Sequence, residues 1–279
     1  MKRSTALTTI LALALHFTMG QTTFTVQVTG KGEPVFLFPG FGCPGEVWEE
    51  TAGELSKTYE CHIFTFAGFG NVPAIEIPWL PKIKDEIISY TNSLQSGKPV
   101  LIGHSLGGTL SLWLTSSEPN MFKKAIVVDA LTCTAALLNP NYRKGDFYEY
   151  DNPQSNNILN MSNEEFKAMN EQSVPFMCLN KEKQNTIVSW LCMADRKTYV
   201  YGYVDYLNLD LREDISKIKI PVIILAATAY PDKNSIQATY NSQYQKLPGI
   251  KILYADNSAH FIMFDQPEWF IEKIKENVK

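Results

Sequence analysis

The sequence has few of the residues that build metal or redox sites. Its 279 residues include 5 cysteines and 4 histidines. The cysteines form no C-x-x-C pair, and none has the spacing to histidine that is typical of zinc sites. Their odd number leaves at least one thiol unpaired in a monomer. A disulfide between Cys178 and Cys192 and a pair of buried thiols are both open alternatives.

The sequence also lacks an excess of positive charge. It has 25 Lys and Arg against 29 Asp and Glu, for a net charge of −4. Nucleic-acid-binding proteins usually carry a basic patch and a basic overall balance. We therefore expect no nucleic-acid partner. No internal repeat or low-complexity tract interrupts the chain.

Long hydrophobic runs are missing after the N-terminus. No later segment reaches the roughly 18 apolar residues that a membrane-spanning helix needs. The N-terminus itself has Lys2 and Arg3, a short apolar run over 9–15, and small residues at Thr18 and Gly20. This pattern is typical of a secretory signal peptide, here residues 1–20 cut after Gly20, although an uncleaved anchor or an ordinary first helix is the alternative. We expect a secreted or periplasmic protein with no stable membrane span after cleavage.

What the sequence does have is a series of short apolar runs. With 45% hydrophobic and 19% charged residues, it can bury a sizeable core. Most of the runs are continuous and rich in β-branched residues, as in parallel strands buried on both faces, and helical patterns lie between them. This alternation predicts an α/β fold with a mostly parallel sheet. The predicted strands cover residues 24–28, 35–38, 61–66, 100–102, 125–128, 222–226 and 250–254.

The alternation stops between residues 135 and 215. This stretch is rich in Asn, Tyr, Phe and Met, and its patterns predict helices near 163–172 and 182–196. We interpret 135–215 as a helical cap inserted into a core made of 21–134 and 216–279. Its aromatic residues could form a small core of their own or line a substrate cleft.

One short motif points to nucleophilic catalysis. Gly103-x-Ser105-x-Gly107 follows the predicted strand 100–102 and precedes a predicted helix from Leu106. A strand–turn–helix frame around G-x-S-x-G is the context that defines a nucleophile elbow. Ser105 would then stand at the carboxyl edge of the sheet, with the helix dipole and the Leu106 N–H facing developing negative charge.

A serine nucleophile needs a general base, and the histidines supply the candidates. Past residue 20 the chain contains His62, His104 and His260. His62 lies inside a predicted strand, and His104 adjoins the serine within the elbow itself. His260 lies in a loop after the last predicted strand, so by elimination it is the predicted base.

The base in turn needs a carboxylate that holds its tautomer and stabilises the imidazolium. Asp232 lies in the loop after the predicted strand 222–226 and precedes His260. The order Ser105, Asp232, His260 is the chain order of α/β hydrolases. Asp129, at the end of the predicted strand 125–128, is the alternative acid.

An acyl-transfer site also needs donors for the oxyanion. The Gly-containing loop 38–42 follows an early strand and can offer the Phe41 N–H, opposite that of Leu106. The alternative is that this loop is only a glycine turn.

Several motifs together resemble the α/β-hydrolase superfamily, of the capped single-domain type. They are the stretch 32–42, Ala67-Gly68-Phe69-Gly70, the elbow 103–108, and Ala259-His260 followed by Gln266-Pro267-Glu268. The resemblance implies a mostly parallel eight-stranded sheet flanked by helices, with an inserted helical cap. It also implies a Ser105/Asp232/His260 triad with the Phe41 and Leu106 N–H groups as oxyanion donors.

The function implied is a serine hydrolase that cleaves a carboxylic ester through an acyl-enzyme, with neither metal nor organic cofactor. Its partner would be a small-molecule ester with an apolar part. An aminopeptidase or amidase is the first alternative, and it would need an acidic group in the cap to hold an amine. The candidates for that group are Glu149, Asp151, Glu164 and Glu165. A non-catalytic ligand-binding or receptor protein is the second alternative, and a cap that seals the pocket would favour it.

Overall fold

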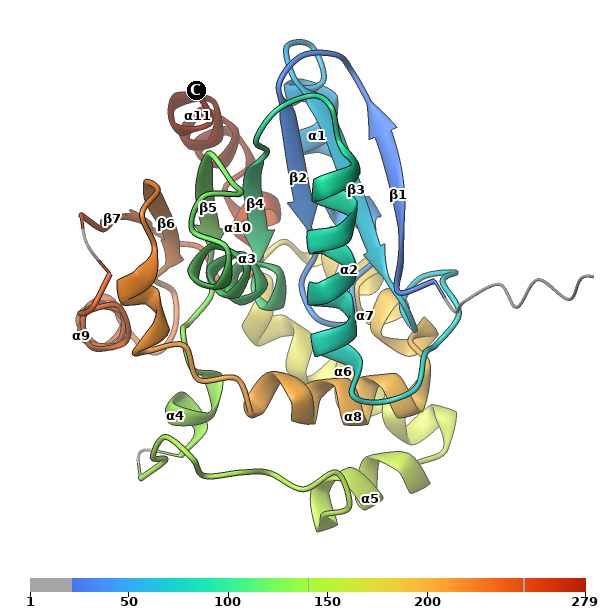
Figure 1. Ribbon diagram of the computed structural model, residues 1–279. Helices are drawn as coiled ribbons and strands as arrows, with labels where there is room; N and C mark the ends of the chain where they lie inside the picture. Colours follow the sequence, from blue (N-terminus) through green and yellow to red (C-terminus); the bar gives the residue numbers. More distant parts are fainter. Residues whose placement is uncertain (1–21, 140, 248) are drawn as a thin grey trace, which may run out of the picture.

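The computed structural model describes residues 22–139, 141–247 and 249–279, which form one sheet covered by helices on both faces (Figure 1). The predicted signal peptide, residues 1–20, lies outside these residues. Seven strands are hydrogen-bonded in the order β1-β3-β2-β4-β5-β6-β7. Their bounds are β1 Phe24–Thr29, β2 Pro34–Phe38, β3 Glu60–Phe66, β4 Val100–His104, β5 Lys124–Val128, β6 Val222–Ala227 and β7 Lys251–Ala255.

The described sheet is parallel except for β1, which pairs antiparallel with β3 at one edge. Each predicted run corresponds to one of the seven observed strands. The expectation of eight strands is corrected, because the described residues form seven. That expectation came from the family resemblance and had no apolar run of its own. The turn at Gly30–Gly32 joins β1 to β2, but β3 lies between the two strands in the sheet.

Helices α1 to α11 and two short 3₁₀ turns complete the described structure. The helices are α1 Glu49–Leu55, α2 Trp79–Ser93, α3 Leu106–Ser117, α4 Thr134–Leu138, α5 Pro153–Asn160, α6 Asn163–Met177, α7 Lys181–Met193, α8 Arg196–Leu207, α9 Lys233–Gln243, α10 Ile262–Asp265 and α11 Pro267–Asn277. The 3₁₀ turns are η1 Gly45–Trp48 and η2 Asp214–Lys217.

The central strands are buried on both faces, which explains their continuous apolar sequences. Every residue of β2 and β4 is buried. One face of the sheet packs against α2, α3 and α9, and the opposite face packs against α1 and α11 (Figure 1). Two apolar layers therefore fix the strands, and the carboxyl ends of β2, β4, β5 and β6 meet at one edge.

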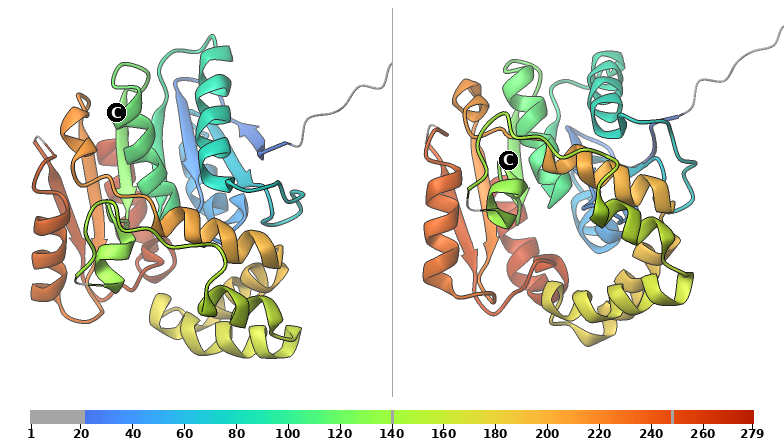
Figure 2. Two further views of the ribbon diagram at one scale, coloured as in Figure 1. Left: turned by 60° about the horizontal axis from the view of Figure 1, so that its bottom comes forward. Right: turned by 90° about the horizontal axis from the view of Figure 1, so that it is seen from below.

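Helices α4 to α8 lie in the chain between β5 and β6, beyond the carboxyl ends of the strands (Figure 2). Side-chain caps define where several of them begin. Ser162 and Glu165 form a capping box at the start of α6, and Asn180 caps α7. The helix predicted over 182–196 is interrupted, because the Asp195 carboxylate accepts from Thr198 N at 2.8 Å and starts α8.

One carboxylate fastens α8 to the rest of the molecule. Oδ2 of Asp205 accepts from the backbone N–H groups of Trp79 and Leu80 at 2.5 and 2.9 Å. Its Oδ1 accepts from the Tyr150 hydroxyl at 2.5 Å. The residue before α2 is Pro78, whose side chain cannot cap the helix. Asp205 therefore supplies the N-terminal cap of α2 from a distant part of the chain.

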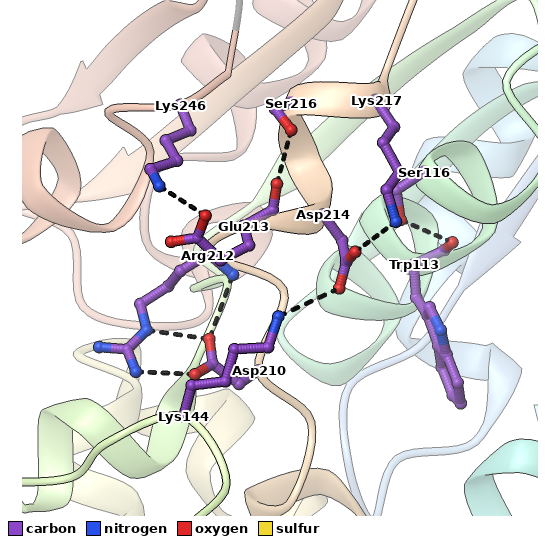
Figure 3. Close-up of polar contacts among 10 residues, drawn as sticks. All are labelled: Trp113, Ser116, Lys144, Asp210, Arg212, Glu213, Asp214, Ser216, Lys217 and Lys246. Carbon is purple, nitrogen blue, oxygen red and sulfur yellow. Dashed lines mark hydrogen bonds and ion pairs between the residues drawn. The ribbon is translucent and has the colours of Figure 1, made fainter.

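The segment between α8 and β6 is held by ion pairs (Figure 3). The Arg212 guanidinium binds both carboxylate oxygens of Asp210, at 2.9 and 2.7 Å. Three further ion pairs orient this segment more than they stabilise it, because an exposed ion pair contributes only about 0–1 kcal/mol to the free energy of unfolding. They are Lys144–Asp214, Lys217–Asp214 and Lys246–Glu213.

All five cysteines are free thiols, so Cys178 and Cys192 are not joined. The Cys178 thiol lies 3.4 Å from a carboxylate oxygen of Asp265 and 3.6 Å from the Asn180 carbonyl. Across the described ranges, no helix combines the length and the apolar character that crossing a bilayer requires.

Replacing Asp205 with Ala should lower the free energy of unfolding by about 1–3 kcal/mol, because two helix N–H groups lose their acceptor. Urea unfolding followed by circular dichroism measures this change. Asp85→Ala is the matched control, since Asp85 lies on α2 and its side chain is 71% exposed. An equal effect of the two substitutions would contradict the capping role.

Candidate active site

Ser105 occupies the sharp turn between β4 and α3. Its backbone has φ 53° and ψ −120°, a conformation that residues other than glycine rarely adopt. The Ser105 N–H donates to the Val128 carbonyl at 2.8 Å, and the Ser105 carbonyl accepts from Gly108 N and Thr109 N. The first turn of α3 and the end of β5 thus hold the strained residue in place.

Glycines around Ser105 allow backbones to approach closely. A Cβ on Gly103 would lie 2.1 Å from the Gly107 carbonyl oxygen. A Cβ on Gly107 would lie 2.4 Å from the Phe38 carbonyl oxygen. Both contacts are with backbone atoms that cannot move aside. The glycines of the motif therefore pack the elbow against β2 as well as forming its turn.

His260 is paired with Asp129. Its Nδ1 lies 2.7 Å from Asp129 Oδ2. Oδ1 of the same carboxylate accepts from Ala227 N and from the Tyr240 hydroxyl, both at 2.9 Å. Burial by itself would raise the pKa of the Asp129 carboxyl, but the hydrogen bonds from His260, Ala227 and Tyr240 bring it below its ordinary value. The carboxylate is thus ionised and fixes the tautomer of His260 with Nδ1 protonated.

The first choice for the acid, Asp232, does not contact His260; the carboxylate beside His260 is that of Asp129, the alternative candidate. The Asp232 carboxylate caps α9, accepting from Asn234 N, Ser235 N and the Ser235 hydroxyl. Five residues separate β6 from α9, and they carry Asp232 to an exposed position at the start of that helix. Asp129 follows the last residue of β5 directly, with φ 44°, and therefore stays at the sheet edge.

The other two histidines have structural contacts. His62, in β3, bonds the Tyr90 hydroxyl and the Glu60 carboxylate. His104 is fully buried, and its Nε2 donates to the His260 carbonyl at 3.0 Å. Burial, aided by nearby His260, lowers the pKa of His104 to about 3. A neutral His104 therefore supports the loop of His260 and cannot exchange protons near neutral pH.

The two predicted oxyanion donors belong to residues near Ser105. Leu106 begins α3, and Phe41 follows Gly40, where a Cβ would lie 3.3 Å from Ser105 Cβ. Among the described residues, neither the Phe41 N–H nor the Leu106 N–H donates a hydrogen bond. Two free backbone donors beside a strained serine suit an oxyanion that forms during attack.

Ser105, His260 and Asp129 line one cavity of about 970 Å³. No hydrogen bond joins Ser105 Oγ to His260 among the described residues; nucleophile–base contacts are often longer in unliganded enzymes. The cavity reaches solvent, because its lining includes the exposed side chains of Leu138 and Phe176. The cap therefore does not seal the pocket. A sealed pocket would have favoured the alternative of a non-catalytic binding protein.

The aromatic residues of the cap both pack on one another and line the cavity, and Tyr148 and Tyr203 do both. Tyr142 stacks on Tyr148 at 6.1 Å and packs with Leu207 in a small separate core. Tyr199 and Tyr203, on α8, line the cavity beside Ser105. Both interpretations of the sequence hold for part of the set. The four acidic candidates for holding an amine, Glu149, Asp151, Glu164 and Glu165, are absent from the described lining.

Asp265, which the sequence analysis did not single out, ties the cap to the His260 loop. Its Oδ1 accepts from Leu179 N at 2.8 Å and Asn180 N at 3.0 Å, and its Oδ2 accepts from Ala259 N at 2.8 Å. Asp265 is the last residue of α10, five residues after His260, and no sequence motif singles it out. Its contacts join the residue before His260 to the 179–180 segment, and we predict that it positions His260.

Asp129→Asn should lower kcat for a p-nitrophenyl ester by about 10³–10⁴-fold, because an amide no longer fixes the tautomer of His260. Asp232→Asn should change kcat less than about twofold. Parallel kinetics on the two variants decides between them. A large loss in Asp232→Asn with little loss in Asp129→Asn would overturn the assignment.

Asp265→Asn should lower kcat about tenfold and reduce thermal stability, because the amide group turns a donor toward one of three backbone N–H groups. Enzyme kinetics and thermal unfolding measure the two effects. Asp256→Asn serves as the control, since Asp256 lies in the same loop but is exposed and pairs with Lys233. Wild-type kcat in Asp265→Asn would refute the positioning role.

The chain is similar to proteins that are named as an esterase and a lactonase. The chain is 24% identical over 196 residues to a pimeloyl-[acyl-carrier protein] methyl ester esterase of Aliivibrio fischeri, covering 70% of this chain and 75% of that protein. It is 22% identical over 265 residues to 3-oxoadipate enol-lactonase 1 of Acinetobacter baylyi, covering 92% and 93%.

The fold is shared with solved structures. A hydrolase from Pseudomonas aeruginosa PA01 matches with a TM-score of 0.76 at 14% identity, covering 91% of this chain and 93% of that chain. A family model described as "Alpha/beta hydrolase family" matches residues 35–273. The chain therefore belongs to the alpha/beta hydrolase family.

Proposed function

We propose that this protein hydrolyses carboxylic esters through an acyl-enzyme, with Ser105 as nucleophile, His260 as general base and Asp129 as its orienting acid. The observation that carries the proposal is the 2.7 Å contact between His260 Nδ1 and Asp129 Oδ2 in the cavity that Ser105 also lines. Ester hydrolysis agrees with the names of the relatives, an esterase and an enol-lactonase.

In the acylation step, Ser105 Oγ attacks the ester carbonyl while His260 Nε2 takes the hydroxyl proton. The carbonyl oxygen becomes an oxyanion between the Phe41 and Leu106 N–H groups, at the positive end of α3. Asp129 remains ionised and stabilises the imidazolium. His260 then gives the proton to the leaving alkoxide, the ester C–O bond breaks, and the alcohol departs.

In the deacylation step, His260 takes a proton from a water molecule, whose oxygen attacks the acyl-enzyme carbonyl. The same two N–H groups receive the second oxyanion. When the tetrahedral intermediate collapses, the proton returns from His260 to Ser105 Oγ, and the carboxylic acid is released. A cavity that is open to solvent supports this step, since water has a route to the acyl-enzyme.

An amidase or aminopeptidase of the same fold is a weaker candidate. An aminopeptidase needs a carboxylate to hold the free amine, and the acidic side chain in the described lining is Asp129, which already bonds His260.

We also propose a secreted or periplasmic location, from the pattern of residues 1–20.

Ser105→Ala should abolish hydrolysis of a p-nitrophenyl ester series, with a loss of at least about 10³-fold in kcat. It should also abolish labelling by a fluorophosphonate probe. Ser173→Ala is the control, because Ser173 lines the same cavity but is not the proposed nucleophile. This variant should still be labelled by the probe. Failure of the folded wild type to react with the probe, or labelling that persists in Ser105→Ala, would refute the mechanism.

A further inference from the structure

The lining of the active-site cavity is almost free of charge. Among the described residues that line it, no lysine or arginine occurs, and the acidic side chain is Asp129. All other polar groups are hydroxyls, amides, a thiol and the two histidines of the site. The cavity is also large, at about 970 Å³, which is near the upper end for small-molecule sites.

This pattern discriminates between substrates by charge. A carboxylate or phosphate entering the cavity would lose its hydration without meeting a cation, and it would lie near the ionised Asp129. Burying an uncompensated ion is strongly unfavourable, and like charge adds to the penalty. Burying an ammonium group in the cavity is also unfavourable, because Asp129 already accepts hydrogen bonds from His260, Ala227 and Tyr240.

Two tyrosines beside the oxyanion loop offer contacts to an uncharged substrate. Tyr199 and Tyr203 lie one turn apart on α8, and their rings contact the Phe41 ring at centroid distances of 5.4 and 5.3 Å. Among the described residues, neither hydroxyl has a hydrogen-bond partner. Burial raises the pKa of both to about 12, so both are neutral donors. They suit a carbonyl, ether or hydroxyl oxygen held against an aromatic wall.

The mouth of the cavity continues its apolar character to the surface. Leu137 and Leu138, at the end of α4, are 55% and 59% exposed and also line the cavity. Phe176, near the end of α6, is 68% exposed, and its ring meets that of Tyr230 at 6.0 Å. An apolar chain longer than the cavity would therefore stay in contact with apolar surface as it leaves.

We propose that the substrate is an uncharged ester whose larger part is apolar, and that esters with an anionic group on the buried part are rejected. This inference rests on the proposed function, because it describes the substrate of that same site. It excludes substrates whose acyl chain ends in a free carboxylate inside the cavity.

The test compares dimethyl suberate with monomethyl suberate at pH 7.5, with hydrolysis followed by acid release. The two esters have the same eight-carbon chain and differ in a methyl ester or a carboxylate at the far end. We expect kcat/KM to be at least 100-fold higher for the diester. Values within threefold of each other would overturn the inference.

A variant that adds a cation to the cavity tests the physical cause. Gln154, on α5, is exposed and lines the cavity, so Gln154→Arg should fold. We expect the ratio of kcat/KM for diester over monoester to fall at least tenfold. Asn157→Arg adds the same charge to an exposed position on α5 outside the described lining and should leave the ratio unchanged. An unchanged ratio in Gln154→Arg, or an equal fall in both variants, would contradict the electrostatic cause.

The failure of this inference can be told from the failure of the proposed function. If both suberate esters are hydrolysed equally and Ser105→Ala abolishes both reactions, the function stands and the charge selectivity is wrong. If no ester is hydrolysed and the fluorophosphonate does not label Ser105, the proposed function itself is wrong.

Discussion

The site depends on the backbone conformation of Ser105. At φ 53° and ψ −120° this residue is strained, and the surrounding packing has to hold it. Gly103 and Gly107 let β4, α3 and β2 approach at distances that a side chain would prevent. Because α3 starts at the next residue, its free N–H groups and dipole face the serine. The strained turn therefore places the proposed nucleophile next to the first turn of α3, whose free Leu106 N–H is a proposed oxyanion donor.

The remaining groups reach Ser105 because parallel strands end at the same edge of the sheet. Asp129 leaves the end of β5, and its carboxylate is satisfied by Ala227, the last residue of β6. His260 lies after β7, in a loop held by the His104 ring and by the Asp265 carboxylate. Asp265 also accepts hydrogen bonds from the loop between α6 and α7, so the cap and the loop of His260, the proposed base, are held by one side chain. A change in the position of the cap would therefore also affect the position of His260.

The sequence predicted features that depend on burial better than those that depend on loop geometry. All seven described strands were visible as short runs. The central strands β2, β4 and β6 are buried along their whole length and tolerate few polar residues, whereas the edge strand β1 alternates apolar and polar residues. The sequence favoured Asp232 as the acid, because both aspartates follow a strand and precede His260, whereas the structure places Asp129 beside His260. Asp129 is next to its strand, whereas four residues separate Asp232 from β6, and Asp232 itself caps α9. Asp265 was missed because its role arises from contacts with the distant 179–180 segment.

The central claim is that Ser105, His260 and Asp129 act on an ester whose oxyanion is held by Phe41 and Leu106. A crystal structure of the protein after reaction with an octyl fluorophosphonate tests it most directly. The account predicts a phosphorus bonded to Ser105 Oγ and a phosphonyl oxygen within about 3 Å of both N–H groups. The octyl chain should lie in the uncharged cavity. A phosphorus on another residue, or a phosphonyl oxygen directed away from Phe41 and Leu106, would contradict the account.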